Sequence, residues 1–189
     1  MTSFILIRHA ESPWSDDDNR PLSAAGLTAA KSLPERLAAF SIDAIYSSPY
    51  RRSMQTVVPL ARCRGLEVCE AFELRERTLG AYRCASFAEA MEASWSDFDV
   101  INPGGESSRD AQARVRDLVE QLAHRHQSQT VVLATHGNLL ALLLNAFDRR
   151  VDFDFWKSLA FPDAFELQVL PAGAGVFRRI DEREGASFG

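Results

Sequence analysis

The sequence has few lysines, no excess of positive charge and no long apolar segment. Only Lys31 and Lys157 are lysines, and acidic residues outnumber basic ones by 26 to 21, which gives a formal net charge of −5. A protein that held duplex DNA mainly through its overall charge would usually be basic, so we expect no nucleic-acid partner. The longest apolar run, around 139–144, is too short to cross a bilayer, so we expect no membrane partner.

Cysteine is also scarce, and its spacing excludes common scaffolds. Cys63, Cys69 and Cys84 are odd in number and form no CxxC pair, which argues against a disulfide framework or a zinc ribbon. We therefore expect no metal and no cofactor, and a cytoplasmic location. The first apolar stretch, 4–7, has only four residues and no basic segment before it, so it is interpreted as a strand rather than a secretory signal.

The length of 189 residues favours one domain over 1–189, with enough apolar content for a substantial core. Hydrophobic residues make up 46% and charged residues 25%, so the composition excludes disorder. The stretch 70–107 is irregular and is predicted to be a lid or insertion. The sequence makes no prediction of oligomeric state.

Short apolar strands alternate with helical periodicity along the chain. Strands are predicted at 4–7, 42–46, 66–68 and 130–134, with a C-terminal hairpin at 165–170 and 175–180 that turns at 171–174. Helices are predicted at 23–40 with Ser23 as N-cap and a kink at Pro34, from 47–49 to Gly65, at 87–95, from Ser107 or Ser108 onward, and from Gly137 to Phe147. The alternation predicts an α/β fold, a three-layer αβα sandwich with a mainly parallel central sheet and an antiparallel C-terminal edge.

Two of the predicted strands end in the same way. His9 follows the first strand and His136 follows the strand at 130–134, and a small residue comes after each histidine. Ligands of parallel sheets lie beyond the carboxyl ends of the strands, so both imidazoles would enter one pocket if these strands are neighbours. Arg8 needs an anionic partner if it is buried, either a carboxylate such as Glu11 or Asp110, or a phosphate.

Five sequence blocks then carry a family resemblance. They are Arg8-His9-Ala10-Glu11-Ser12 with Trp14, Ser47 to Thr56, Glu73 to Gly80, Gly104-Gly105-Glu106-Ser107, and Ala134-Thr135-His136-Gly137. In this order they resemble the histidine phosphatase superfamily, the phosphoglycerate mutase-like group that includes broad-specificity phosphatases. Ala10 stands where that family usually has glycine. The ordered set spans most of the chain, so the resemblance is specific.

The resemblance implies a mechanism and a set of site residues. His9 would attack phosphorus and form a phosphohistidine, while Arg8, Arg52 and His136 surround the phosphate oxygens. Glu76 would donate a proton to the leaving group and then act as a base on water. Such an enzyme is a metal-independent phosphoric monoester hydrolase. Because Glu76 must carry a proton at first, burial or phosphate charge has to favour its protonated form.

Three further expectations concern the surroundings of this site. The helix that starts at Gly137 would present its N-terminus, and so its positive end, to the phosphate. Ser15 stands where many relatives have asparagine, and its hydroxyl could reach a phosphate oxygen. Arg75 and Arg77 would oppose protonation of Glu76 if they faced it, so we expect both side chains to point away.

The substrate is predicted from the length of the segment after Glu76. Only 27 residues, 77–103, separate Glu76 from Gly104, whereas phosphoglycerate mutases carry longer insertions and tails that enclose the intermediate. A short lid admits water, which favours a phosphatase acting on small phosphomonoesters. The loop 19–23 resembles that of phosphohistidine phosphatases, so a protein phosphohistidine phosphatase is one alternative and a phosphoglycerate mutase is another.

A different class of function is a non-catalytic module that binds a phosphorylated ligand, which would need neither histidine nor Glu76. A metal-dependent hydrolase that uses His9 and His136 is not supported, because neither residue belongs to an HxxE or HxH cluster. His124 and His126 are interpreted as solvent-facing residues near a helix C-terminus. The aromatic cluster is predicted to form core under the hairpin, with one member a candidate for the substrate mouth: Phe153, Phe155, Trp156 and Phe161.

Overall fold

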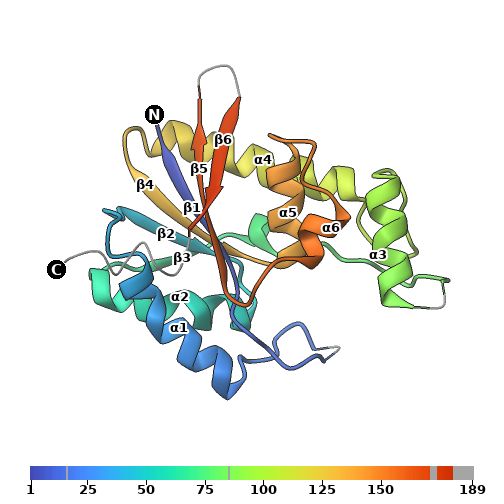
Figure 1. Cartoon of the computed structure of the whole chain (residues 1–189), viewed down its shortest axis with the longest axis horizontal. Coiled ribbons are helices and arrows are strands. Elements are labelled where there is room, and N and C mark those ends of the chain that lie inside the picture. The colour runs from blue at the N-terminus through green and yellow to red at the C-terminus, as the bar shows by residue number, and fades with distance from the viewer. Residues whose placement is uncertain (16, 85, 171–173, 181–189) are drawn as a thin grey trace.

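Figure 1 shows the computed structural model, which describes residues 1–15, 17–84, 86–170 and 174–180. Its central sheet has the strand order β3-β2-β4-β1-β5-β6. The strands are β1 (Ser3–Arg8), β2 (Ala44–Ser47), β3 (Val68–Glu70), β4 (Thr130–Thr135), β5 (Asp163–Val169) and β6 (Gly175–Arg179). The strands β1 to β4 pair with one another in parallel, whereas β5 is antiparallel to both β1 and β6. The predicted sheet with an antiparallel C-terminal edge is confirmed.

Helices cover both faces of this sheet. They are α1 (Ala24–Arg36), α2 (Arg51–Arg64), α3 (Phe87–Ser96), α4 (Ser108–Arg125), α5 (Gly137–Asn145) and α6 (Phe153–Lys157), with a 3-10 turn η1 (Phe72–Leu74). In Figure 1, α1 and α2 lie on one side of the sheet and α4, α5 and α6 on the other. The three-layer prediction is therefore confirmed.

The alternation of side chains along the strands explains why there are two cores. Successive side chains of a strand point to opposite faces of the sheet. In β1, Phe4 and Leu6 join the core beneath α4 and α5, whereas Ile5 and Ile7 join the core beneath α1 and α2. All four side chains are fully buried, as expected for a strand covered on both faces.

The predicted helix signals mark most helix boundaries. The Ser23 hydroxyl accepts a hydrogen bond from the Gly26 N–H at the start of α1, and Ser107 caps α4 in the same way. Gly65 ends α2 in the left-handed conformation at φ 65°. The first helix stops at Arg36 instead of 40, two residues after Pro34, which has no N–H to donate within the helix.

Two C-terminal features differ from the prediction or lie beyond what is described. Three of the four predicted core aromatics, Phe153, Phe155 and Trp156, belong to the short helix α6, none of whose residues is fully buried. The fourth, Phe161, is exposed, and it lines the cavity as one member of the cluster was predicted to do. Phe155 and Trp156 only pack against the margin of the core beneath α4 and α5. Of the predicted turn at 171–174, residues 171–173 lie outside the described residues. No helix within the described ranges has the length and apolar character needed to span a membrane.

Candidate active site

The two histidines predicted to share a pocket come together at the carboxyl ends of β1 and β4. Because these strands pair in parallel with Arg8 opposite Thr135, His9 and His136 leave the sheet side by side. Their ring centroids are 5.2 Å apart and the rings meet edge to face. The predicted meeting of the two imidazoles is confirmed.

His9 is held as a neutral imidazole with a defined tautomer. Its Nδ1 lies 2.7 Å from the Ala10 carbonyl oxygen, which can only accept, so Nδ1 carries the proton. Arg52 Nε donates to the remaining nitrogen, Nε2, across 3.2 Å. Burial, aided by the positive charges of Arg52 and Arg8, lowers the pKa of His9 to about 3. The nitrogen with the free electron pair is thus Nε2, beside a guanidinium group.

His136 is fully buried and lies deeper in the site. Its Nε2 is 2.8 Å from the Ser48 hydroxyl oxygen, while its Nδ1 has no hydrogen-bond partner within the described part of the chain. Burial, together with His9 and Arg52, lowers the pKa of His136 well below its usual value. Burial therefore favours the neutral form of the His136 imidazole, and the charged form that would help most with an oxyanion needs a nearby negative charge.

Within the described residues Arg8 forms no ion pair with Glu11 or Asp110, and the carboxylates whose charges act on it are Glu76 and Asp163. Arg8 Nη1 donates to the Leu159 carbonyl oxygen across 2.7 Å, and its Cζ lies 3.4 Å from the centroid of the Phe161 ring. Its buried Nε has no partner among the residues described. Burial lowers the pKa of Arg8 to about 10, still far above neutrality, so the guanidinium keeps its charge.

Gly137 lies against this guanidinium. A Cβ on Gly137 would be 2.8 Å from Arg8 Nε and 2.9 Å from Arg8 Cζ, closer than real contacts allow. The absence of a side chain at position 137 therefore gives Arg8 its place at the pocket. This is a steric role, in addition to the predicted phosphate-binding role of the helix N-terminus.

Arg52 and Arg20 supply two further positive charges. Arg52 is only 3% exposed, and its Nη1 donates to the Asp18 carbonyl oxygen across 2.8 Å. Arg20 lines the same cavity, and its charge helps to lower the pKa of Arg52, after burial as the main cause. No role was predicted for Arg20 from the sequence. Its position in the loop 19–23, which resembles that of phosphohistidine phosphatases, was the one feature that could have indicated a place at the site.

Glu76 lies at the N-terminus of α5, the helix end that was predicted to face the phosphate. Its carboxylate accepts hydrogen bonds from the backbone N–H groups of Arg77 at 2.9 Å, Asn138 at 3.0 Å and Leu139 at 2.9 Å. The last two are first-turn amides, which have no partner inside the helix. Three backbone donors therefore fix the position of the Glu76 carboxylate.

Within the described residues Arg75 and Arg77 form no ion pair with Glu76; burial lowers the pKa of Arg77, and the nearby Glu76 charge partly opposes that shift. Arg75 Nη2 lies 3.5 Å from the Glu106 carboxylate, and Arg77 donates to the Ser94 hydroxyl across 3.0 Å and to the Glu106 carbonyl oxygen across 3.1 Å. Both guanidinium groups are therefore committed elsewhere, and the Glu76 carboxylate faces the cavity.

These residues share one cavity of about 610 Å³, lined by Arg8, His9, Ser12, Trp14, Asp18, Arg20, Tyr50, Arg52, Glu76, Arg77, Thr78, Leu79, Tyr82, Phe87, Met91, Gly137, Asn138, Trp156 and Phe161. His136 lies directly behind His9 and Tyr50. Ser15 is not on the wall; its hydroxyl accepts a hydrogen bond from the Asp17 N–H across 3.1 Å. Of the predicted site residues, the structure thus brings all but Ser15 together.

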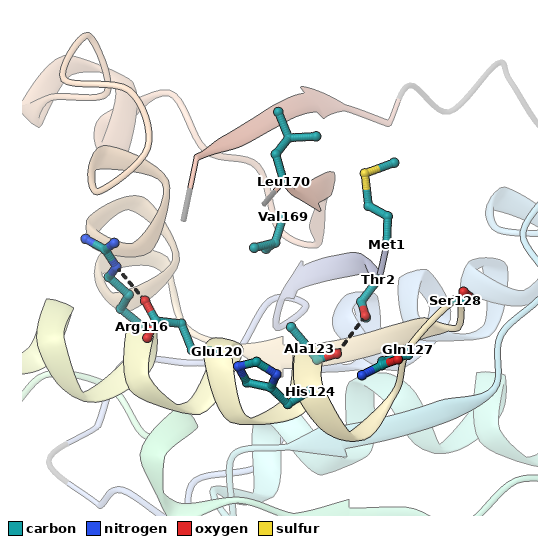
Figure 2. A pocket seen from close by; sticks show the side chains of 10 residues that line it. All are labelled: Met1, Thr2, Arg116, Glu120, Ala123, His124, Gln127, Ser128, Val169 and Leu170. Atoms are coloured by element: carbon teal, nitrogen blue, oxygen red, sulfur yellow. Dashed lines mark hydrogen bonds and ion pairs between the residues drawn. The ribbon is translucent and has the colours of Figure 1, made fainter. Parts of the chain in front are cut away.

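A second cavity of about 660 Å³ lies at the opposite end of the sheet, beside Met1, α4 and the end of β5 (Figure 2). Two contacts join polar groups of its wall: Arg116 binds Glu120 at 3.1 Å, and the Thr2 hydroxyl donates to the Ala123 carbonyl oxygen. His124 lines this cavity, far from the two site histidines. In the described part of the chain, no group of three or more His, Cys, Asp or Glu could hold a metal ion.

Comparisons with known proteins all find similarity to phosphatases. A family model described as the histidine phosphatase superfamily (branch 1) matches residues 4–178. The chain is 34% identical to phosphoserine phosphatase 1 of Hydrogenobacter thermophilus over 153 residues, 72% of this chain and 71% of that protein. It is 32% identical to a metal-independent phosphoserine phosphatase of Arabidopsis thaliana over 157 residues, 74% of this chain and 66% of that protein.

A solved structure is similar over nearly the whole chain. It is a mycobacterial glucosyl-3-phosphoglycerate phosphatase in complex with inorganic phosphate, with a TM-score of 0.75 and 27% identity, covering 94% of each chain.

Proposed function

The chain belongs to the histidine phosphatase superfamily, branch 1, and from this premise we propose that it hydrolyses small phosphomonoesters through a phosphohistidine on His9. The observation that carries the proposal is the state of His9. Its Nδ1–H is held by the Ala10 carbonyl, and its free nitrogen faces a cavity with Arg8, Arg52 and Glu76. A neutral imidazole with one fixed proton is the form that acts as a nucleophile.

Binding of the substrate depends on the positive charges around His9. A phosphate dianion beside His9 accepts hydrogen bonds from Arg8, Arg52 and Arg20, and from His136 Nδ1, which has no hydrogen-bond partner within the described residues. The Arg52 Nε–H then turns from His9 to a phosphate oxygen, which frees the Nε2 electron pair.

The first chemical step transfers the phosphoryl group to His9. The Nε2 pair forms a bond to phosphorus as the bond from phosphorus to the ester oxygen breaks, and the leaving oxygen takes a proton from Glu76. The Ala10 carbonyl stabilises the positive charge that develops on the ring. The arginines offset the negative charge on the transferred oxygens.

The second step returns the enzyme to its starting state. Glu76, now ionised, takes a proton from water as the water oxygen bonds to phosphorus and the bond between phosphorus and Nε2 breaks. The backbone amides of Arg77, Asn138 and Leu139 stabilise the ionised form of Glu76, which suits it to act as the base. Inorganic phosphate then leaves.

The names of the relatives support an ester of a small alcohol. Two relatives are named phosphoserine phosphatases, and the similar solved structure is named for a glucosyl-phosphoglycerate substrate. A protein phosphohistidine phosphatase has a nitrogen leaving group and does not need Glu76 as a donor. A mutase would keep the phosphoryl group from water, whereas this cavity opens past exposed side chains such as Trp14.

The proposal is tested by steady-state hydrolysis of a chromogenic aryl phosphate in the presence of a metal chelator, with phosphoglycerate isomerisation measured in parallel. We expect release of inorganic phosphate by the native protein, no release by His9→Ala, and no isomerisation. Binding of phosphate without any turnover would instead support a non-catalytic phospho-ligand module. Dominant isomerisation would support the mutase alternative.

A further inference from the structure

Exposed aromatic side chains gather at one place on this protein. Within the described residues five aromatic side chains are exposed, and four of them line the active-site cavity: Trp14, Tyr82, Phe87 and Phe161, with Phe72 the exception. Exposed aromatic surface is unfavourable in water, so such a gathering around a cavity marks a surface that a ligand covers.

We propose that the leaving group of the natural substrate carries an aromatic ring or another flat apolar group. This inference rests on the phosphatase function proposed above and specifies its substrate class. It concerns the part of the cavity that the phosphate does not fill.

The cavity wall combines two chemically different kinds of side chain. His9, Glu76 and the arginines are polar or charged, whereas the apolar wall consists of Leu79, Tyr82, Phe87, Met91 and Trp156. Phe161 adds an exposed ring beside the reacting groups, since it lies over the Arg8 guanidinium and 5.6 Å from the His9 ring. An ester whose phosphate lies at His9 therefore directs its alcohol part along aromatic surface.

The apolar wall is built by separate segments of the chain whose aromatic rings contact one another. Phe87 begins α3 and Trp156 belongs to α6, and the two rings are in contact at 6.3 Å between centroids. Phe153 stacks on the other side of Trp156 at 5.5 Å. These contacts hold the Trp156 ring, so it offers a preformed surface to a ligand at little cost in conformational entropy.

A small polar leaving group finds few hydrogen-bonding partners at the apolar wall. The serine part of phosphoserine carries an ammonium and a carboxylate group, and each needs an opposite charge when water is removed. Two charged side chains of the cavity already have partners: Asp18 accepts from the Tyr50 hydroxyl at 3.2 Å, and Arg77 donates to Ser94 and to the Glu106 carbonyl oxygen. The apolar walls therefore favour a ring over a zwitterion.

The test compares two esters whose leaving groups differ only in a ring. 3-Phenylpropyl phosphate and n-propyl phosphate release alcohols of similar basicity, so a difference in kcat/KM reports contacts made by the ring. We expect a ratio of roughly tenfold or more in favour of the phenyl ester, the size expected from covering one ring in an apolar pocket. O-Phosphoserine should be turned over no faster than n-propyl phosphate.

Three variants test which aromatic side chains cause the difference in kcat/KM between the two esters. Phe87→Ala and Trp156→Ala should each lower the ratio by about threefold or more, and Phe72→Ala, which removes an exposed ring outside the cavity, should leave the ratio unchanged. The ratio is the readout because loss of active protein lowers both rates equally.

Two results overturn the inference while leaving the phosphatase function intact. One is turnover of both esters with a ratio near one, and the other is a clear preference for O-phosphoserine. Absence of turnover with every ester would overturn the phosphatase function itself.

Discussion

Replacement of Gly137 by alanine tests the close approach between α5 and Arg8. The new Cβ would lie 2.8 Å from Arg8 Nε, so the guanidinium must retreat by about 0.6 Å to reach the 3.4 Å of ordinary contact. It cannot retreat freely, because Nη1 donates to the Leu159 carbonyl oxygen and the Phe161 ring lies over Cζ. Misplacement of a phosphate-binding group on this scale lowers kcat/KM by about 10-fold to 100-fold, or about 1.4 to 2.8 kcal/mol.

The same change should not unfold the protein. Gly137 is not among the glycines with positive φ, so alanine fits its backbone, and alanine favours a helix by up to about 1 kcal/mol over glycine. The atom displaced is at the end of a side chain rather than in the backbone. We therefore expect the thermal unfolding midpoint to stay close to that of the native protein while activity falls.

A double-mutant cycle isolates the cause. If the penalty arises from contact with Arg8, then Gly137→Ala should change kcat/KM by less than about twofold in an Arg8→Ala background. The assay is hydrolysis of a chromogenic aryl phosphate by the four proteins of the cycle, with thermal unfolding as a control for folding. Full activity of the single variant, or an equal penalty in both backgrounds, would refute the reasoning.

Two further predictions concern His9 and Glu76. In the folded state His9 stays neutral down to its pKa of about 3, whereas an unfolded histidine takes up a proton near pH 6.5, so stability is lost as pH falls between these values. From pH 7 to pH 5 this amounts to about 2 kcal/mol in the free energy of unfolding, which urea denaturation measures, and His9→Asn should reduce the loss by about that amount; an unchanged loss would contradict the burial of a neutral His9. Glu76→Gln should slow hydrolysis of alkyl phosphates more than that of aryl phosphates, whose leaving groups need less protonation, whereas an equal loss with both would remove Glu76 from the donor role.

The meeting of the two histidines could be predicted because it depends on local pattern. An apolar strand followed by histidine and a small residue occurs twice, at His9 and His136, and parallel strands place such residues at one edge of the sheet. The same periodicity predicted most strands and helices. The sequence could not predict that β1 and β4 are neighbours in the sheet, since strand order depends on tertiary packing.

The partners of the charged groups could not be predicted, because they are backbone atoms distant in sequence. Arg8 donates to the Leu159 carbonyl, and Glu76 is held by the amides of Asn138 and Leu139. Neither contact leaves a residue-type signal, because every residue has a carbonyl and nearly all have an N–H. The sequence predicted that the N-terminus of α5 faces the phosphate, and it gave no sign that the Glu76 carboxylate accepts from two amides of that turn, those of Asn138 and Leu139.

The short helix α6 was missed for a related reason. Its five residues, Phe153–Lys157, include three closely spaced aromatic residues. A segment this short is too small to show the helical periodicity that would distinguish a helix from a buried loop. Aromatic residues are usually core, and only the packing of α6 against α3 leaves Trp156 on a cavity wall.

The account as a whole depends on a covalent bond between phosphorus and His9 Nε2. The direct measurement is rapid quenching of the protein during turnover of a labelled phosphomonoester, followed by a test of the stability of the label in acid and in base. We predict a labelled protein that loses phosphate in acid and keeps it in base, with the label on His9 and absent from His9→Ala. Turnover without any labelled protein, or a label that survives acid and persists in His9→Ala, would contradict the mechanism.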